Sequence, residues 1–425
     1  MAPGHASAPR DLRCAAVVVV GGGPVGLSCA LFLRQQGVPV FVLEASTEPA
    51  LDMRASTFHP PTLDMLEADG VAAELMRQGT PVPRWQYRMH ESGESIVFDM
   101  SSVAAFTRHP FRLQCEQWRL VRAVADRLTR DDDATLLMGA RVTGLSTDGP
   151  GVCLEYSIGA DARTIRADYV IAADGAGSTM RSLLNLPFEG DTYLTRSITV
   201  VLDCPFERYL PSLLPVNYCW TEDDRFSLMR VGELWRTGYS PRRGQSVEEA
   251  LSNEYIAAHV QRVAGGNAEY RVVHKAAYTV HRRLLEHFRK GRVLFAGDAA
   301  HLNSPSGGMG MNSGIHDAYV LAGSVAAVLR GEPDQRLDDY DVQRHQVARD
   351  DIQQAADRHH NLHREIEPVQ RRANWDHLKH VAADPTRMME YLLGSSMIRP
   401  LLRYGVAPIP LRQGRGQPFI SGESS

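Results

Sequence analysis

The sequence predicts an α/β fold that combines a parallel sheet, an inserted second sheet and a helical C-terminal region. Short apolar runs at 17–20, 167–173 and 292–296 each end in a turn that contains glycine, which is typical of buried parallel strands. Residues 197–240 instead contain several short runs rich in aromatic and β-branched residues, which favour an antiparallel sheet. Beyond residue 330 the chain is polar and has a helical pattern.

The composition places the chain among ordinary globular proteins. Its 425 residues allow about two to three domains, and 44% hydrophobic with 23% charged residues exclude a fibrous or mostly disordered chain. A formal net charge of −4 gives no basic surplus for binding nucleic acid. The six cysteines form no CxxC pair, and the first apolar run is too short for a signal peptide or a membrane span. We therefore expect a cytoplasmic protein without stable membrane insertion.

A glycine-rich turn of the form G-x-G-x-x-G follows the first strand at 21–26 and opens a helix expected over 27–36. Its glycines let the backbone approach a pyrophosphate, and the helix N-terminus offers free N–H groups and a positive dipole end. Glu44 ends the next strand, where its carboxylate can accept hydrogen bonds from ribose hydroxyls. The motif predicts a site for the ADP half of a dinucleotide and leaves NAD and FAD open. Its candidate residues are Gly21, Gly23, Pro24, Val25, Gly26, Glu44 and Ala45.

Further elements follow in order along the chain. We expect a helix from about residue 61, a hairpin over 84–100 and a helix over 118–130. The strand-rich region is expected to contain strands at 198–202, 217–221, 226–231 and 233–239. A long apolar-faced helix is expected over 310–330, because glycine and proline stop the pattern just beyond it.

Two later motifs each follow a predicted strand. Residues 174–181 read D-G-A-G-S-T-M-R, and Gly297-Asp298 is followed by P-S-G-G-M-G-M-N over 305–312. With the glycine-rich turn, these motifs resemble the class A flavoprotein aromatic hydroxylases, the family of para-hydroxybenzoate hydroxylase. The resemblance extends over residues 17–330.

The resemblance implies bound FAD in a discontinuous Rossmann-like domain made of residues 12–82, 108–190 and 275–365. The mixed or antiparallel substrate sheet would comprise 83–107 and 191–274, and residues 366–425 would form the helical C-terminal segment and tail. Asp298 would hold ribityl hydroxyls, and Asp174 would brace the fold or serve the NADPH or FAD site. The other implied flavin contacts are Arg54, Gln114 and the helix start at Gly310, Met311 and Asn312.

The same resemblance implies a reaction. NADH or NADPH would bind transiently, and O₂ would be used to hydroxylate a small phenolic or otherwise activated aromatic or heteroaromatic compound through a flavin C4a-hydroperoxide. The carbonyl of Pro305 would face the substrate, and His301 is a candidate base with a structural role as its alternative. The residues leave the substrate, the choice of nicotinamide and the oligomeric state open, a homodimer included.

The inserted sheet supplies candidate substrate residues. Aromatic and arginine side chains there could form the wall of the site, although strand aromatics commonly just pack in the core. An arginine that faces the flavin would favour an aromatic carboxylate, and its absence a neutral phenol. The candidates are Tyr218, Trp220, Arg230, Trp235 and Arg236, with Tyr239 beside them.

Other functions share parts of this pattern. A reductase or epoxidase acting on an isoprenoid or alkene has the same fold and is the main alternative, and a non-enzymatic FAD-binding protein is another. A flavin halogenase lacks support, because the chain has no W-x-W-x-I-P segment and its first lysine is Lys275. The histidines at 359, 360 and 363 have metal-like spacing but lie in a polar helical stretch, so we expect no metal.

Overall fold

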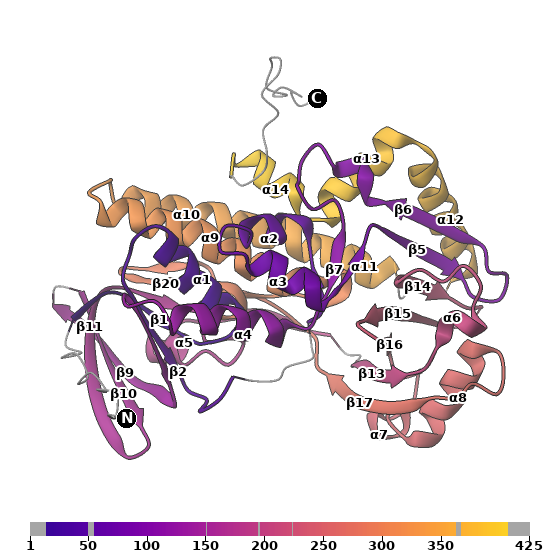
Figure 1. The fold of residues 1–425 in the computed structure, drawn as a ribbon, viewed down its shortest axis with the longest axis horizontal. Helices are drawn as coiled ribbons and strands as arrows, with labels where there is room; N and C mark the ends of the chain where they lie inside the picture. The colour runs from indigo at the N-terminus through magenta and orange to yellow at the C-terminus, as the bar shows by residue number, and fades with distance from the viewer. Residues whose placement is uncertain are drawn as a thin grey trace, which may run out of the picture.

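The computed structural model describes residues 14–49, 55–149, 151–193, 196–222, 224–362 and 367–406 (Figure 1). Arg54, an implied flavin contact, and His363 of the histidine cluster lie outside the described residues. The fold is the predicted α/β type, with one sheet of eight strands, one of seven and two of three.

The eight-stranded sheet has a parallel centre. Its strands are β1 (Cys14–Val20), β2 (Val40–Glu44), β8 (Ala134–Met138), β9 (Ala140–Gly149), β10 (Gly151–Ile158), β11 (Asp161–Ala172), β19 (Arg289–Lys290) and β20 (Val293–Phe295). The order β20-β11-β1-β2-β8 is parallel throughout, and β19, β10 and β9 add antiparallel strands. Strand β11 is longer than expected, because its polar first half pairs with β10 before its apolar end enters the parallel centre.

Helices pack on this sheet and on one another. The principal ones are α1 (Pro24–Gln35), α4 (Gln117–Leu128), α9 (Met309–Leu329) and α10 (Gln335–Gln346). Helix α1 contacts both α4 and α9, and α9 contacts α10 (Figure 1). The shorter helices are α2 (Pro60–Met65), α3 (Val71–Gln78), α5 (Thr179–Leu183), η1 (Met100–Val103), η2 (Gly297–Ala299) and η3 (Ser306–Gly308). The helices expected near 61, 118–130 and 310–330 are confirmed.

The seven-stranded sheet joins two separate parts of the chain. Its strands, in spatial order, are β17 (Arg271–Tyr278), β13 (Ser197–Asp203), β16 (Leu234–Tyr239), β15 (Arg225–Val231), β14 (Val216–Trp220), β5 (Arg84–Met89) and β6 (Ser95–Asp99). All neighbours are antiparallel except β14 and β5, which run parallel where the two chain segments meet. The expected hairpin and four strands are confirmed, and the sheet is mixed.

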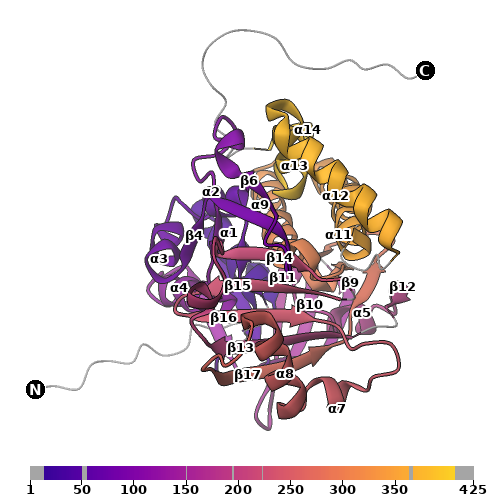
Figure 2. The same cartoon turned by 90° about the vertical axis from the view of Figure 1, so that its right-hand side faces the viewer.

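The two faces of this sheet have different neighbours. The outer face packs on α6 (Phe206–Tyr209), α7 (Val247–Ala250) and α8 (Asn253–Ala264), with Leu228, Trp235 and Val260 in one cluster (Figure 2). Side chains of Val216, Tyr218 and Trp220 on the other face belong to the main core instead. We call this second surface the inner face.

Two small sheets complete the strand structure. One contains β3 (Thr57–Phe58), β7 (Arg112–Gln114) and β4 (Thr80–Val82), and β7 contacts β15 of the large sheet. The other contains β12 (Glu189–Thr192), β18 (His281–Leu284) and β21 (His301–Leu302).

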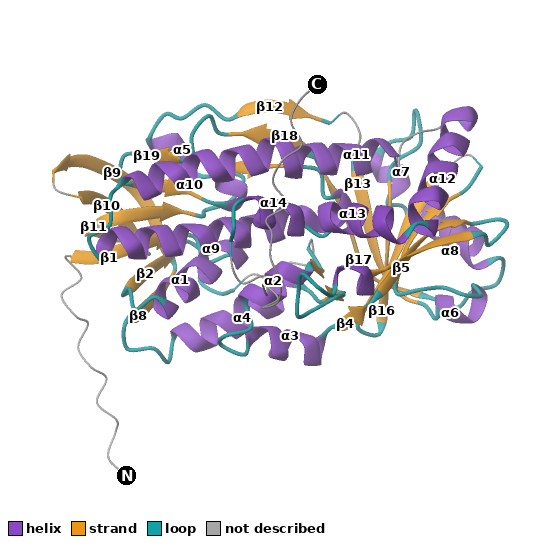
Figure 3. Ribbon diagram, turned by 90° about the horizontal axis from the view of Figure 1, so that it is seen from above, coloured by secondary structure: helices purple, strands orange, loops and turns teal. Residues whose placement is uncertain are grey.

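The C-terminal region is helical, as predicted. A π-helix, η4 (Val347–Gln353), continues α10 into α11 (Gln354–Leu362), and α12 (Pro368–Ala383), α13 (Pro385–Ser395) and α14 (Ile398–Arg403) follow. Helix α12 contacts β6 and α13 contacts η1, and Figure 3 shows both at the end of the molecule that holds the seven-stranded sheet. Among the described residues, no helix is both long and apolar enough to span a membrane.

Candidate active site

The glycine-rich turn is held by contacts that leave no room for side chains at two positions. Gly21 has φ +109°, and a Cβ there would lie 2.4 Å from the carbonyl oxygen of Ala173 at the end of β11. A Cβ on Gly26 would lie 2.0 Å from the carbonyl oxygen of Gly21. Gly23 differs, because a Cβ there would meet no atom within 4 Å. The turn therefore packs tightly against the protein at Gly21 and Gly26, and it has free space beside Gly23.

The carboxylate of Glu44 is fixed by this turn. Its Oε2 accepts a hydrogen bond from Gly22 N–H at 2.5 Å, and its Oε1 accepts one from Ser46 N–H at 2.7 Å. Each carboxylate oxygen has a further lone pair. The side chain, with Ala45 beside it, is half-buried at the end of β2. This placement fits the expected contact with an adenosine ribose.

Two helix N-termini meet near this turn. Neither α1, which begins at Pro24, nor α9, which begins at Met309, has a side-chain cap or an acidic residue in its first turn. Val25 of α1 packs against Gly314 of α9, where a Cβ would lie 2.5 Å from its Cγ2, and against Gly297 of η2, where a Cβ would lie 2.9 Å from the same atom. The free N–H groups and positive dipole ends of both helices are thus available to anionic groups.

The second and third motifs are tied together by a buried arginine. Arg181 Nη1 donates to the carbonyl oxygens of Ala299 at 2.8 Å and Asp298 at 3.4 Å, and burial lowers the pKa of this guanidinium. Asp174 Oδ2 accepts from Met180 N–H at 3.0 Å, while its buried Oδ1 has no partner among the described residues. Asp298 is exposed between buried neighbours, so its carboxylate points away from the core.

The loop before α9 is clamped to β3. Asn312, fully buried, donates from Nδ2 to the carbonyl oxygens of Thr57 and Gly308, both at 2.8 Å, and its Oδ1 accepts from His59 N–H at 2.9 Å. Gly308 has φ +67°, and a Cβ there would lie 3.0 Å from Thr57 Cβ. The side chain of Asn312 therefore fastens the start of α9 to β3.

The remaining predicted flavin and substrate residues lie at the start of α9, in the loop before it and on β7. Gly310 and Met311 lie in its first turn, whose N–H groups have no intrahelical acceptor. Pro305 is exposed just before it. On β7, the buried Gln114 accepts a hydrogen bond from Thr57 Oγ1 at 3.1 Å through Oε1, while its Nε2 has no partner among the described residues.

These features fit the group that the motifs imply. The open side of Gly23 and two uncapped helix N-termini supply donors suited to a flavin dinucleotide. The buried polar atoms of Asp174 and Gln114 that lack a protein partner add an acceptor and a donor. Glu44 would hold the adenosine ribose and Asp298 the ribityl chain. Arg181 was not singled out from the sequence, although it closes the motif that contains Asp174.

His301 is locked in the core. Its Nε2 lies 2.8 Å from Asp317 Oδ2, its ring stacks on Phe288 with centroids 5.7 Å apart, and it is 1% exposed. Asp317 also accepts from Arg344 Nε at 2.6 Å and from Gly297 N–H at 3.0 Å. These contacts favour the structural alternative for His301, and its catalytic role stays a prediction.

The substrate candidates divide between the two faces of the seven-stranded sheet. Arg236 lies on the inner face and donates to Ser56 Oγ and Thr199 Oγ1, both at 3.3 Å. Tyr218 is on the same face, and so is Trp220, whose ring packs on Trp375 of α12 with centroids 5.6 Å apart. The sheet thus brings Arg236 and Tyr218 toward the β3–β7 region.

Three of the substrate candidates lie on the outer face of the seven-stranded sheet. Trp235 Nε1 donates to Glu207 Oε2 at 3.0 Å, and Arg230 donates to Gly232 O at 3.1 Å and lies 3.8 Å from Glu207. Both side chains therefore belong to the outer face, as does Tyr239, which donates to Ala250 O. Side chains alternate between the two faces along each strand. Because both faces of this sheet are apolar, the sequence pattern alone could not show which face each side chain occupies.

Sequence reasoning missed Arg112, two residues before Gln114 on β7. This arginine is 1% exposed, its Cζ lies 4.4 Å from the centroid of the Trp85 ring, and Nη1 donates to Tyr218 Oη at 3.4 Å. One signal was available: a charged residue inside a short run that must be buried.

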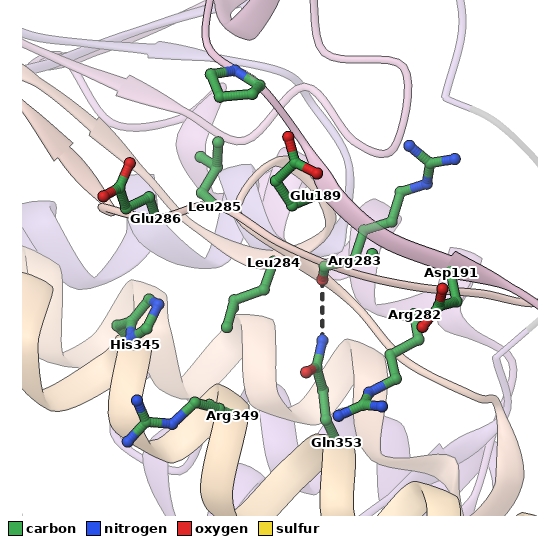
Figure 4. A pocket seen from close by; sticks show the side chains of 12 residues that line it. Glu189, Asp191, Arg282, Arg283, Leu284, Leu285, Glu286, His345, Arg349 and Gln353 are labelled. Carbon is green, nitrogen blue, oxygen red and sulfur yellow. Dashed lines mark hydrogen bonds between the residues drawn. The ribbon is translucent and has the colours of Figure 1, made fainter.

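A cavity of about 460 Å³ lies elsewhere, between β12, β18 and η4 (Figure 4). Gln353 Nε2 crosses toward β18 and donates to Arg283 O at 3.0 Å. Carboxylates and guanidiniums share the lining, so the charge favours neither anions nor cations. Its lining residues include Glu189, Asp191, Arg282, Arg283, Glu286, His345, Arg349 and Gln353. None of the predicted site residues is among them.

One cluster of potential metal ligands occurs in the described part of the chain, at Asp64, Glu67 and His109. The Asp64 carboxylate is already engaged by Thr107 Oγ1 at 2.7 Å, Arg108 N–H at 3.1 Å and His109 Nδ1 at 2.8 Å. The Asp64 carboxylate thus holds the 107–109 segment by hydrogen bonds, and these contacts account for the cluster without a metal.

Replacing Glu44 with alanine is expected to weaken FAD binding about 10- to 100-fold, because charge-assisted hydrogen bonds contribute about 1.5–3 kcal/mol. Titration of the apoprotein with FAD, followed by flavin fluorescence, measures the change. Glu48→Ala removes the same charge from an exposed position on the same loop and should leave the affinity unchanged. Equal affinities for the two variants would contradict the ribose contact.

Comparisons with known proteins agree with this site. A family model described as "FAD binding domain" matches residues 14–355. The chain is 31% identical over 384 residues to para-nitrophenol 4-monooxygenase of Pseudomonas sp. (strain WBC-3), covering 89% of this chain and 94% of that protein. It is 27% identical over 384 residues to 6-hydroxy-3-succinoylpyridine 3-monooxygenase of Pseudomonas putida (strain DSM 28022 / S16), covering 88% and 96%.

A solved structure extends the likeness to the fold. The crystal structure of p-nitrophenol 4-monooxygenase from Pseudomonas putida DLL-E4 matches with a TM-score of 0.84 and 30% identity, over 92% of this chain and 98% of that one. The match therefore includes both the dinucleotide-binding region and the inserted sheet. By sequence, by fold and by the assembly of its three motifs, the chain belongs to the class A flavoprotein aromatic hydroxylases and is an FAD-dependent monooxygenase.

Proposed function

We propose that the protein uses NADH or NADPH and dioxygen to hydroxylate a small phenol or hydroxypyridine. The observation that carries this proposal is the inner face, where Arg236 reaches Ser56 just before β3 and Tyr218 reaches Arg112 of β7. The similar proteins named above act on p-nitrophenol and on 6-hydroxy-3-succinoylpyridine, both small hydroxylated rings. Polar groups set among aromatic side chains suit such a substrate.

The chain's own residues have separate tasks in this reaction. The N-termini of α1 and α9 would stabilise negative charge on bound FAD, since both present free N–H groups. The buried aromatic side chains and the C-terminal helices beside the sheet exclude water. Arg236 and Tyr218 orient the ring, and the exposed Pro305 offers its carbonyl near the substrate. When bound, FAD would supply the redox chemistry that connects nicotinamide, dioxygen and ring.

A screen of phenols, anilines, hydroxypyridines and aromatic acids tests the proposal. Purified holoenzyme is expected to consume NADH or NADPH faster with one of these rings than without it, and the product should gain the mass of one oxygen atom. Isoprenoids and alkenes form the second arm of the screen. Stimulation by that arm alone would favour the epoxidase alternative, and no mass change on any aromatic compound would refute the hydroxylase.

A further inference from the structure

Arg112 is a buried charge without a counter-charge. Among the described residues, no carboxylate lies within 4.0 Å of its guanidinium, and its Nε has no hydrogen-bond acceptor. The equally buried Arg344 shows the usual arrangement, with Asp317 Oδ1 at 2.6 Å. Arg112 therefore lacks the counter-charge that Arg344 has.

The neighbours of Arg112 compensate only part of its charge. The Trp85 ring offers a cation–π contact, and the Tyr218 hydroxyl accepts one long hydrogen bond. Burial raises the pKa of Tyr87 and of Tyr391, the latter to about 12, so these nearby phenols stay neutral. A guanidinium has five N–H donors and remains charged in proteins, and burying such a charge unpaired is costly.

Arg112 shares a face of β7 with Gln114, one of the implied flavin contacts. Residues two apart on a strand share a face, so Arg112 and Gln114 point the same way from β7. Thr57, opposite Gln114 in the ladder, bonds that glutamine and packs against Gly308 of the loop before α9. Arg112 therefore lies about 7 Å along the strand from Gln114, on the surface that meets the inner face.

We propose that Arg112 binds a negatively charged oxygen of the aromatic substrate, either a carboxylate on the ring or a phenolate, and so makes the enzyme select anionic rings. The Tyr218 hydroxyl orients the guanidinium, and Trp85 holds it by its face. A planar fork of donors matches a carboxylate or a phenolate oxygen. This assignment rests on the proposed function and names its substrate class.

Binding to the oxidised holoenzyme tests the assignment without turnover. The probes are 4-hydroxybenzoate against 4-hydroxybenzamide for the carboxylate, and 4-nitrophenol above and below the pH at which it ionises for the phenolate. Binding of each probe is measured from the change that it causes in the flavin absorbance. Wild type should bind the anionic member of one pair at least about tenfold more tightly, and Arg112→Gln should abolish that preference. The pair that responds identifies the oxygen.

Matched variants separate recognition from folding. Arg230→Gln removes an arginine from the outer face of the same sheet and should leave the preference unchanged. Arg112→Lys keeps a positive charge and should retain part of the preference, and Tyr218→Phe should reduce it. FAD content and the thermal midpoint are measured for each variant. If Arg112→Gln does not fold, Arg112→Lys and Tyr218→Phe test whether Arg112 sets the preference for anionic rings.

The outcomes separate this inference from the proposed function. Equal binding of neutral and anionic rings by wild type, or an equal loss of both in the variants, overturns the role of Arg112 while the hydroxylase stands. A lysine variant that binds neutral and anionic rings alike also overturns it. If no ring stimulates NAD(P)H oxidation or binds at all, the proposed function and this inference fail together.

Discussion

Replacing Asp317 with alanine is expected to lower the free energy of unfolding by about 3–5 kcal/mol, the range for removing one partner of a buried ion pair. The substitution leaves Arg344, which is 1% exposed, without its counter-charge. It also removes the acceptor of Gly297 N–H and of His301, so the turn that carries Asp298 loses its support. We therefore expect lower FAD content as well as lower stability.

The stabilisation by Asp317 should depend on pH in one direction. Burial opposes ionisation of this carboxyl, but Arg344 and His301 outweigh it, so the pKa lies below its usual value. A carboxyl with a lowered folded-state pKa stabilises the fold above the unfolded-state pKa of about 3.9, and this stabilisation is lost as the pH falls further. The difference between wild type and Asp317→Ala should be constant near neutral pH and narrow below about pH 4.

Urea denaturation of the holoprotein at several pH values measures both effects. Asp338→Ala is the matched control, because Asp338 pairs with Arg289 at 2.8 Å but its side chain is 53% exposed. This exposed pair should contribute at most about 1 kcal/mol. A loss of less than 1 kcal/mol in Asp317→Ala would show that the buried network is not what holds the turn.

Gly23→Ala is expected to abolish most FAD binding while the fold survives. The backbone of Gly23 has φ −76°, which any residue adopts, and its Cβ would meet no protein atom within 4 Å. The second glycine of this motif lets the backbone approach the pyrophosphate, so the methyl group would occupy space needed by the cofactor. Flavin absorbance per chain should fall, while the circular dichroism spectrum stays unchanged.

Two other glycines provide the comparison. Gly26→Ala should damage the fold itself, because its Cβ would lie 2.0 Å from Gly21 O. Gly323→Ala, in the middle of α9 with open space beside it, should leave FAD content unchanged and add up to about 1 kcal/mol of stability. Full FAD occupancy in Gly23→Ala would show that the pyrophosphate does not lie beside this turn.

The motifs of the dinucleotide site could be predicted because their chemistry is local. Gly21, Gly23 and Glu44 are set by a strand, a turn and the next strand, and the structure places them as expected. The parallel pairing of β14 with β5 could not be predicted, since it joins residues 217–220 to 86–89 across more than a hundred residues. Local patterns carry no information about such a pairing.

The sequence by itself determined the α/β fold, the glycine turns that approach a dinucleotide and the helical end of the chain. These follow from apolar periodicity and from the few residues that tight turns accept. Only the tertiary structure decided that Arg236 lies on the inner face of the seven-stranded sheet and Arg230 on its outer face, and that Arg112 is buried without a carboxylate partner. The register of a sheet and the solvation of a charge depend on segments far apart in the chain.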